Sequence, residues 1–473
     1  MALSMSVRRS VAVVLAMLLA LTAMAFGVAT VTHPSRVARA MPAITGHIEL
    51  GGLHTPPTTS DCLNRLFGFH CYQPFQLQKA YNLKPLFDRG FDGRGRTIVL
   101  VDSFGSPTIR NDLHVFDQTF GLPDPPSFNI IQPAGAPPPF DPNNSDMAGW
   151  AAETTLDVEW SHVIAPGANL LLVETPVSET EGVQGFPEIV RAENFVIDHD
   201  LGDVISQSFG ATENTFPSQA SLLALRGSFQ NARNHHVTVL ASSGDDGATN
   251  FQLNLTDLYT FPVNSWPSSD PLVTSIGGTM LTLDDSGNRL ASDVVWNDLN
   301  TVGGGAGGGG KSQVFARPPF QNGVRSVVGD ARGTPDISMS AAVDGAVVFY
   351  HTYLPSDSQA SRGPWHIVAG TSEASPLFAG IVAIADQMAG HRLGWLNGRL
   401  YQLAGGQEQQ PTGLVDVTQG NNTFGPFTNS DGTTHTVQGF NALVGYDMAS
   451  GWGTVDAASF VPAIAMLGDE GGD

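Results

Sequence analysis

The sequence predicts an α/β fold in which a parallel central sheet carries helices on both faces. Three observations support this fold class: short apolar runs recur along the chain, small or polar residues follow each run, and helical stretches lie between the runs. Strands that alternate with helices form parallel sheets with both faces covered. In such sheets the functional residues gather at the carboxyl ends of the strands.

The elements follow one another from residue 76 onward, with no internal repeat. One domain from 76 to 473 is therefore the simplest partition. A glycine run at 303–310 is either a linker or a loop that lines a cleft. The expected strands are 96–101, which ends at Asp102, then 170–173, 204–205 and 237–240. The expected helices are 148–163, 186–199, 218–234 and one that begins at 370 and reaches about Met388.

The composition limits the function. The 473 residues include 44 acidic side chains against 22 Lys and Arg, a formal net charge of −22. Nucleic-acid binding needs a cationic surface, so this balance argues against it. Only 14% of the residues are charged. A surface with few basic groups suits acidic surroundings, because protonation of its carboxylates then reduces self-repulsion. The simpler alternative is the general acidity of many secreted proteins.

The N-terminus has the features of an export signal. Arg8 and Arg9 precede a mostly apolar stretch at 10–32, and the small-x-small triplet at 23–25 is a candidate cleavage site. We therefore expect a signal peptide at 1–25. The alternative is an uncleaved N-terminal membrane anchor. No later segment is apolar for long enough to span a membrane, so we expect no membrane association beyond this signal.

Residues 26–75 are interpreted as a short prosegment or linker, because they are rich in Pro, Thr, His and Gly and have no strong period. The two cysteines of the chain, Cys62 and Cys71, lie in this segment. They would close a small disulfide loop in an oxidising compartment. The export signal and this loop together predict a secreted, extracellular protein, which we expect to be a monomer.

Ser372 is the candidate nucleophile. It stands in a G-T-S string at 370–372 that opens a helix. A serine at this point exposes its hydroxyl at a strand-to-helix turn, and the helix N-terminus offers N–H groups to a developing oxyanion. The alternative is that Thr371 or Ser372 is only the N-cap of the helix, the commonest use of such residues.

Glu153 and Asp157 form a candidate proton-transfer pair. They are four residues apart, so they lie on one face of the predicted helix. Like charges at that spacing repel, so the pair is favourable only if one carboxyl is protonated and donates to the other. Many such pairs lie on solvated helix surfaces. The Ala, Leu, Val and Trp residues around this one favour a partly buried dyad.

Together these strings resemble those of the sedolisins, the serine-carboxyl peptidases of the subtilisin-like clan. The resemblance extends from about Cys71 to Phe460, and it implies a subtilisin-like parallel central sheet and a peptidase domain over 76–473. The matching strings are E-x-x-x-D at 153–157, S-Q-S-F-G at 206–210, S-G-D-D-G at 243–247, I-G-G-T at 276–279, T-P-D-I-S at 334–338 and G-T-S with P-L-F-A-G at 370–380.

The resemblance implies a Ser-Glu-Asp triad that acts in acid on polypeptide substrates through an acyl-enzyme. Ser372 would attack, Glu153 would take its proton, and Asp157 would orient Glu153. Asp245 would donate to the oxyanion, which requires a neutral carboxyl. Asp246 departs from the family, which usually has a small residue there. A carboxylate with a pKa of about 4 still accepts a proton at acidic pH, where a histidine is already protonated.

A calcium site is expected near the C-terminus. Asp416 and Asp447 read as turn residues from the sequence alone, although carboxylates and carbonyls are oxygen donors that suit Ca²⁺. Sedolisins bind one Ca²⁺ with an equivalent pair, so the resemblance implies one structural ion. The implied ligands are the side chains of Asp416 and Asp447 and the carbonyls of Val417, Leu443 and Gly445, where Leu443 replaces a frequent glycine.

Two other functions remain open. One is a subtilisin-type Ser-His-Asp peptidase that uses Asp102, His162 and Ser372, although the sequence has no H-G-T-H string. The other is a catalytically inactive secreted binding protein with the same fold. In the serine-carboxyl interpretation, Asp102 is a strand-end residue with a structural hydrogen-bonding role, and His162 is structural. The segment upstream of the domain is shorter than the large folded propeptide of many sedolisins.

Overall fold

The computed structural model describes residues 48–302, 304–354, 363–405 and 412–467. The predicted signal peptide at 1–25 and the first part of the segment 26–75 lie outside these ranges, and the domain limits stay predictions. Within the described ranges, none of the helices combines the length and the hydropathy that crossing a bilayer requires.

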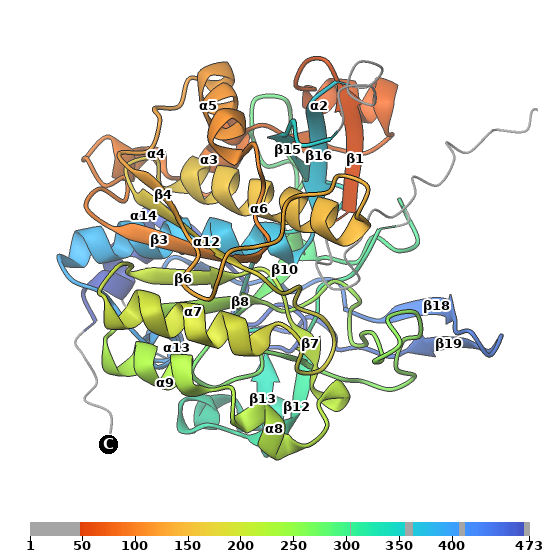
Figure 1. Cartoon of the computed structure of the whole chain (residues 1–473). Helices are drawn as coiled ribbons and strands as arrows, with labels where there is room; N and C mark the ends of the chain where they lie inside the picture. The colour runs from red at the N-terminus through yellow and green to blue at the C-terminus, as the bar shows by residue number, and fades with distance from the viewer. Residues whose placement is uncertain (1–47, 303, 355–362, 406–411, 468–473) are drawn as a thin grey trace, which may run out of the picture. The chain divides into compact units, whose positions relative to one another are not determined.

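A mostly parallel sheet forms the centre of the fold (Figure 1), which confirms the predicted α/β class. Its strands are β3 (Thr97–Ser103), β4 (Phe128–Ile131), β5 (Asn169–Thr175), β6 (Val204–Gln207), β8 (Thr238–Ser242), β10 (Thr274–Met280), β11 (Val294–Val295) and β14 (Ile337–Ser340). In the described chain their order is β11-β10-β8-β6-β3-β5-β4, and β14 also pairs with β10. Neighbouring strands are parallel except for β10 and β11.

The alternating side chains of β3 show how the sheet separates two cores. Ile98 and Leu100 belong to one apolar cluster, and Val99 and Val101 belong to the other. Successive residues of a strand point to opposite faces, so a run that is apolar at every position must be covered on both sides. This requirement explains why the four continuous apolar runs of the sequence became β3, β5, β6 and β8.

Helices cover both faces of the sheet (Figure 1). On one face lie α6 (Ser145–Ile164) and α12 (Thr371–Ala389), and on the other lie α7 (Phe186–Asp198) and α9 (Gly227–Asn234). The helix expected over 218–234 is instead two helices, α8 (Gln219–Leu223) and α9. The break precedes Gly227, a residue type that disfavours helix interiors. The other α-helices in the described ranges are α2 (Thr59–Asp61), α3 (Pro74–Ala80), α4 (Lys84–Phe87), α5 (Ile109–Phe120), α10 (Arg325–Val328), α13 (Leu396–Gly405) and α14 (Ala457–Ala465).

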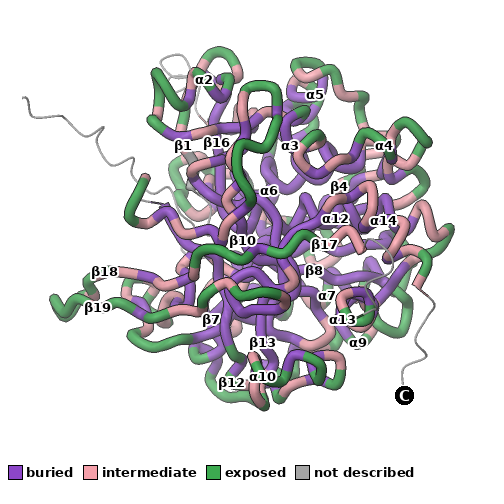
Figure 2. Tube along the Cα trace, turned by 180° about the vertical axis from the view of Figure 1, so that it is seen from behind, coloured by how far each residue is buried: buried purple, intermediate pink, exposed green. Residues whose placement is uncertain are grey.

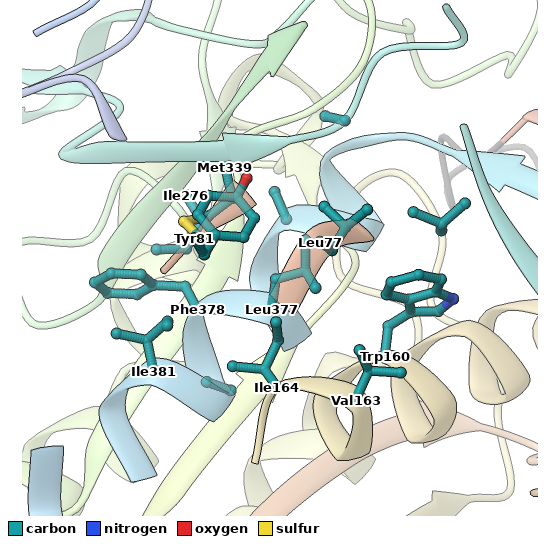
Figure 3. Close-up of a cluster of buried hydrophobic side chains, with 14 of the residues drawn as sticks. Leu77, Tyr81, Trp160, Val163, Ile164, Ile276, Met339, Leu377, Phe378 and Ile381 are labelled. Carbon is teal, nitrogen blue, oxygen red and sulfur yellow. The ribbon is translucent and has the colours of Figure 1, made fainter. Parts of the chain in front are cut away.

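The close contact between α6 and α12 determines where the site lies (Figure 3). A Cβ at Gly380 of α12 would stand 2.6 Å from the Ile164 Cβ of α6, so only glycine permits this approach. Leu377 and Ile381 of α12 pack in the same cluster as Ile164 (Figure 3). Because α6 carries the two predicted carboxyls and α12 begins beside the predicted serine, this packing brings the two motifs together.

A second sheet leads into the serine segment. It has the order β1-β16-β15-β2 and includes residues upstream of the predicted domain limit. The disulfide expected between Cys62 and Cys71 is present. The strands are β1 (Ile48–Leu53), β2 (Cys71–Tyr72), β15 (Ala346–Tyr350) and β16 (Trp365–Ala369). Smaller pairs are β7 (Ala211–Thr212) with β9 (Ser265–Trp266), β12 (Gly310–Ala316) with β13 (Ala331–Thr334), β17 (Leu414–Val415) with β20 (Thr454–Val455), and β18 (Phe424–Thr428) with β19 (Thr434–Val437).

Candidate active site

The predicted carboxyl pair lies inside the protein. Every residue of α6 from Gly149 to Ile164 is buried, as the tube in Figure 2 illustrates for this helix. Asn144 caps the N-terminus of the helix: its side chain accepts from the N–H groups of Asp146 and Met147. A helix that is apolar around most of its circumference belongs in a core. Glu153 and Asp157 are therefore a buried dyad and not a solvated acidic surface.

A third carboxyl joins this pair. Asp102, at the carboxyl end of β3, is fully buried and interacts electrostatically with both Glu153 and Asp157. Burial, followed by the charge of Glu153, raises the pKa of Asp102 well above its usual range. Burial, Asp102 and Glu153 raise the pKa of Asp157 in the same way. Asp102 and Asp157 are therefore buried carboxyls that interact, and such groups share protons.

Ser208 connects the carboxyl pair to the predicted nucleophile. Its hydroxyl donates to Asp157 Oδ1 at 2.7 Å and also lies 3.3 Å from the Ser372 carbonyl oxygen. In return, the Ser372 hydroxyl donates to the Ser208 carbonyl oxygen at 3.3 Å. Ser208 directly follows β6, and Ser372 lies in the first turn of α12. The carboxyl end of the sheet thus brings the two serines and Asp157 together.

Asp245 lies on the other side of the serine segment. It follows β8, and its Oδ1 accepts from the Thr371 N–H at 2.8 Å and from the Thr371 hydroxyl at 2.7 Å. Its Oδ2 has no hydrogen-bond partner among the described residues. Burial, with a smaller contribution from the half-buried Asp246, raises the pKa of Asp245 to about 8 against the lowering effect of the Thr371 bonds. Below that pH the Asp245 carboxyl is mostly neutral, and its Oδ2 can donate a hydrogen bond.

The structure does not bring His162 together with Asp102 and Ser372. The His162 Nε2 lies 2.7 Å from the Pro123 carbonyl oxygen and 3.5 Å from Asp117 Oδ2. Burial lowers the pKa of this histidine to about 4. Its contacts are those of a structural histidine at the packing face of α6, as the serine-carboxyl interpretation expects.

Sequence reasoning did not predict how three residues contribute to the carboxyl site. Thr371 was considered only as a cap, Ser208 only as part of a matching string, and Asp102 as a structural strand-end residue or as the acid of the Ser-His-Asp alternative. A signal existed for each, because Thr371 adjoins the serine and the other two stand at the carboxyl ends of predicted strands. Which strand end meets which helix depends on contacts between distant segments, and the sequence pattern does not contain them.

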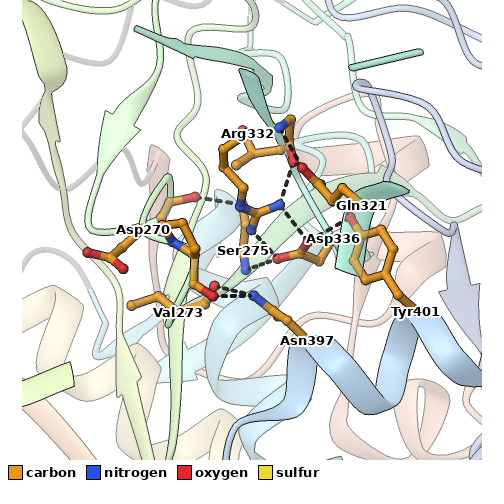
Figure 4. Close-up of polar contacts among 12 residues, drawn as sticks. Asp270, Val273, Ser275, Gln321, Arg332, Asp336, Asn397 and Tyr401 are labelled. Atoms are coloured by element: carbon orange, nitrogen blue, oxygen red, sulfur yellow. Dashed lines mark hydrogen bonds and ion pairs between the residues drawn. The ribbon is translucent and has the colours of Figure 1, made fainter. Parts of the chain in front are cut away.

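The T-P-D-I-S string has a structural role (Figure 4). Asp336 forms a fully buried ion pair with Arg332, in which Nη1 donates to Oδ1 at 2.7 Å and Nη2 donates to Oδ2 at 2.5 Å. Asp336 also accepts from the Ser275 N–H at 2.8 Å and from the Tyr401 hydroxyl at 2.9 Å. Asp336 therefore links β13, β10 and α13 through Arg332, Ser275 and Tyr401.

The expected calcium ligands come from two segments, 416–417 and 443–447, which a hydrogen bond joins. Asp416 Oδ2 accepts from the Gly445 N–H at 2.9 Å, and Asp447 Oδ2 accepts from the Leu443 N–H at 2.8 Å. No group of three or more His, Cys, Asp or Glu side chains suited to a metal occurs in the described chain. A site here must therefore combine the two carboxylates with backbone carbonyls, and an all-oxygen set of that kind fits Ca²⁺.

The family model of the subtilases matches residues 145–399. The chain belongs to the subtilase family. It is 29% identical to kumamolisin of Bacillus sp. (strain MN-32) over 358 residues, which cover 74% of this chain and 57% of that protein. It is 30% identical to sedolisin of Pseudomonas sp. (strain 101) over 293 residues, which cover 61% and 45%. The chain thus spans about half the length of these curated relatives.

A solved sedolisin structure is also similar to this subtilase. Pseudomonas sedolisin, a serine-carboxyl proteinase complexed with two molecules of pseudo-iodotyrostatin, superimposes with a TM-score of 0.65 at 26% identity. The match covers 84% of this chain and 98% of that one. The resemblance to sedolisins that the motifs indicated is confirmed, as is the subtilisin-like sheet.

Proposed function

We propose that this subtilase is a secreted, acid-acting serine-carboxyl peptidase that hydrolyses peptide bonds of polypeptide substrates. One observation carries the proposal: Ser208 bonds both to Asp157 of the buried carboxyl pair and to the Ser372 segment. These hydrogen bonds link the serine segment to a buried carboxyl, whereas His162 contacts the Pro123 carbonyl oxygen and Asp117. The sedolisin relatives support the same chemistry.

In the proposed reaction, Glu153 removes the proton of Ser372 as the hydroxyl oxygen attacks the scissile carbonyl carbon. Asp157 orients Glu153 and shares its proton with it, since burial and the neighbouring carboxyls favour the protonated form of Asp157. The Asp157 carboxyl is itself fixed by the Ser208 hydroxyl. Asp102, at the end of β3, helps to keep Asp157 protonated, because its charge raises the pKa of Asp157.

The tetrahedral adduct carries a negative oxygen that needs a neutral donor. Asp245 supplies the hydrogen bond from Oδ2 while Thr371 holds Oδ1. As the adduct collapses, the C–N bond breaks and the leaving amine takes the proton from Glu153. Water then attacks the acyl-enzyme, Glu153 accepts a proton of that water, and Ser372 regains its hydrogen as the acid product leaves.

We also propose one structural Ca²⁺ bound by Asp416, Asp447 and the carbonyls of Val417, Leu443 and Gly445. Such an ion would fix the turn at 443–447 against Asp416. It has no part in the reaction steps above.

Labelling with a peptide aldehyde at pH 4 tests the proposed function. The wild type should form a covalent adduct at Ser372 and degrade a denatured protein, whereas Ser372→Ala should do neither. Glu153→Gln should lose activity while His162→Gln in the folded state retains it. Loss of activity in His162→Gln with an alkaline optimum would favour the Ser-His-Asp peptidase. No labelling of a folded wild type would favour the inactive binding protein.

A further inference from the structure

The loop that carries Asp245 rests on the glycine run. The Ala306 N–H donates to the Asp245 carbonyl oxygen at 2.9 Å, the Gly247 N–H donates to the Ala306 carbonyl at 2.8 Å, and the Gly308 N–H donates to the Gly244 carbonyl at 2.7 Å. A Cβ at Gly305 would stand 2.6 Å from the Asp245 carbonyl oxygen. The run is therefore a backbone platform beneath the loop and not a linker.

Asn422 contacts the same loop at its C-terminal end. Its carbonyl oxygen accepts from the Ala248 N–H at 2.9 Å. Gly247 adopts a left-handed conformation with φ of 60°, and a Cβ there would overlap this carbonyl. The main chain of Asn422 thus holds the last turn of the loop, two and three residues after Asp245.

The side chain of Asn422 ties this contact to the platform. Its Nδ2 donates to the Gly309 carbonyl oxygen at 3.2 Å, and its Oδ1 accepts from the Phe440 N–H at 2.7 Å. Asn422 is fully buried and lies just before β18. Asn422 therefore connects three segments. Its side-chain amide binds Gly309 of the glycine run and Phe440 after β19, and its backbone carbonyl binds the loop of Asp245.

We propose that Asn422 is a positioning residue for Asp245: it clamps the loop 244–248 onto the glycine run 304–309 and so fixes the oxyanion donor. The kinetic consequences of this inference rest on the proposed function, whereas the structural clamp is independent of it. An amide suits this place because it donates to one backbone carbonyl and accepts from one N–H at once. Alanine would remove the partner of the buried Gly309 carbonyl and of the partly buried Phe440 N–H.

Amide hydrogen exchange tests the clamp without reference to activity. In Asn422→Ala, made in the Ser372→Ala background, peptides that cover 243–249 and 304–309 should exchange at least tenfold faster than in Ser372→Ala alone. Asn397→Ala is the matched control. Asn397 is also fully buried, and its Nδ2 donates to the Val273 carbonyl oxygen at 2.9 Å, away from this loop (Figure 4). The control should leave exchange in both peptides unchanged.

Kinetics in the active background test the consequence for Asp245. Asn422→Ala should lower kcat about 10- to 100-fold with KM changed less than threefold, since the oxyanion forms only after substrate binds. The alkaline limb of the pH profile should move to lower pH, because water that reaches Asp245 favours its ionised form. Glu153, Asp246 and Glu373, the charged groups that act on Asp245, stay unchanged in this variant.

Asn422→Asp provides a rescue if the alanine variant folds poorly. A protonated Asp keeps both the donor and the acceptor. Compared with Ser372→Ala at the same pH, loop exchange should therefore be nearly unchanged at pH 4 and faster at pH 7. Unchanged exchange in Asn422→Ala, or an effect equal to that of Asn397→Ala, would overturn the clamp. A wild type without peptidase activity would overturn the proposed function and leave the exchange result to decide the clamp.

Discussion

Thr371 donates two hydrogen bonds to a single oxygen of Asp245, one from its N–H at 2.8 Å and one from its hydroxyl at 2.7 Å. The residue before the proposed nucleophile therefore determines where the proposed oxyanion donor stands. Because both bonds go to Oδ1, the proton of the neutral carboxyl belongs on Oδ2. The Thr371 hydroxyl also accepts from the Gly244 N–H at 3.1 Å, so it has one fixed orientation.

Thr371→Val should lower kcat about 2- to 10-fold, because one neutral hydrogen bond contributes roughly 0.5–1.5 kcal/mol. The bonds from Thr371 lower the pKa of Asp245, so losing one raises it. The alkaline limb of kcat should therefore move to higher pH, the reverse of the shift expected for Asn422→Ala. Thr371→Ser keeps the hydroxyl and should keep the wild-type profile. A limb that moves downward in Thr371→Val would contradict this account.

Asp245 should define the loss of activity at high pH. Its carboxyl donates only while protonated, and burial raises its pKa to about 8, so activity should fall as the pH rises through that value. Asp245→Ala should lower kcat about 10²- to 10³-fold at pH 4. Asp245→Asn carries a donor that does not ionise, so it should retain more activity and lose the alkaline decline. An Asn variant with the wild-type limb would assign that limb to another group.

The stability of the protein should be greater in acid than at neutral pH. In the folded state, burial raises the pKa values of Asp102, Asp157, Glu159, Glu179 and Glu373 well above their usual ranges. These groups keep protons that the unfolded chain releases above about pH 4, so the free energy of unfolding falls as the pH rises. His162, whose pKa burial lowers to about 4, opposes this trend as the pH falls below about 6.5.

The melting temperature measures this difference, which should be on the order of 5–10 °C between pH 4 and pH 8. Glu179→Gln is a suitable control, because Glu179 is buried outside the proposed triad and its charge costs stability only when it ionises. This variant should raise the melting temperature more at pH 8 than at pH 4. A wild type that melts higher at pH 8 than at pH 4 would be inconsistent with buried protonated carboxyls.

The sequence predicted what local pattern determines and missed what distant contacts determine. The runs that became β3, β5, β6 and β8 were visible because each is apolar at successive positions, and Glu153 and Asp157 share a face through helical spacing alone. The disulfide followed from the presence of only two cysteines. By contrast, β1 pairs with β16, which lies about three hundred residues later, and the contact of Gly305 with Asp245 joins separate loops. Nothing in the local sequence at either end specifies such a partner.

Removal of calcium should lower the melting temperature if Asp416 and Asp447 bind the proposed ion. An ion present at about 100 times its Kd stabilises the fold by about 2.7 kcal/mol, and EDTA would remove that contribution. Asp416→Asn is the better variant: within the described residues Asp416 accepts only from the Gly445 N–H, whereas Asp447 also accepts from Ala449 and Ser450. It should melt like the EDTA-treated wild type and respond little to EDTA. Asp431→Asn, an exposed acid between β18 and β19, should keep the wild-type response. An unchanged melting temperature after complete metal removal would mean that hydrogen bonds alone hold this turn.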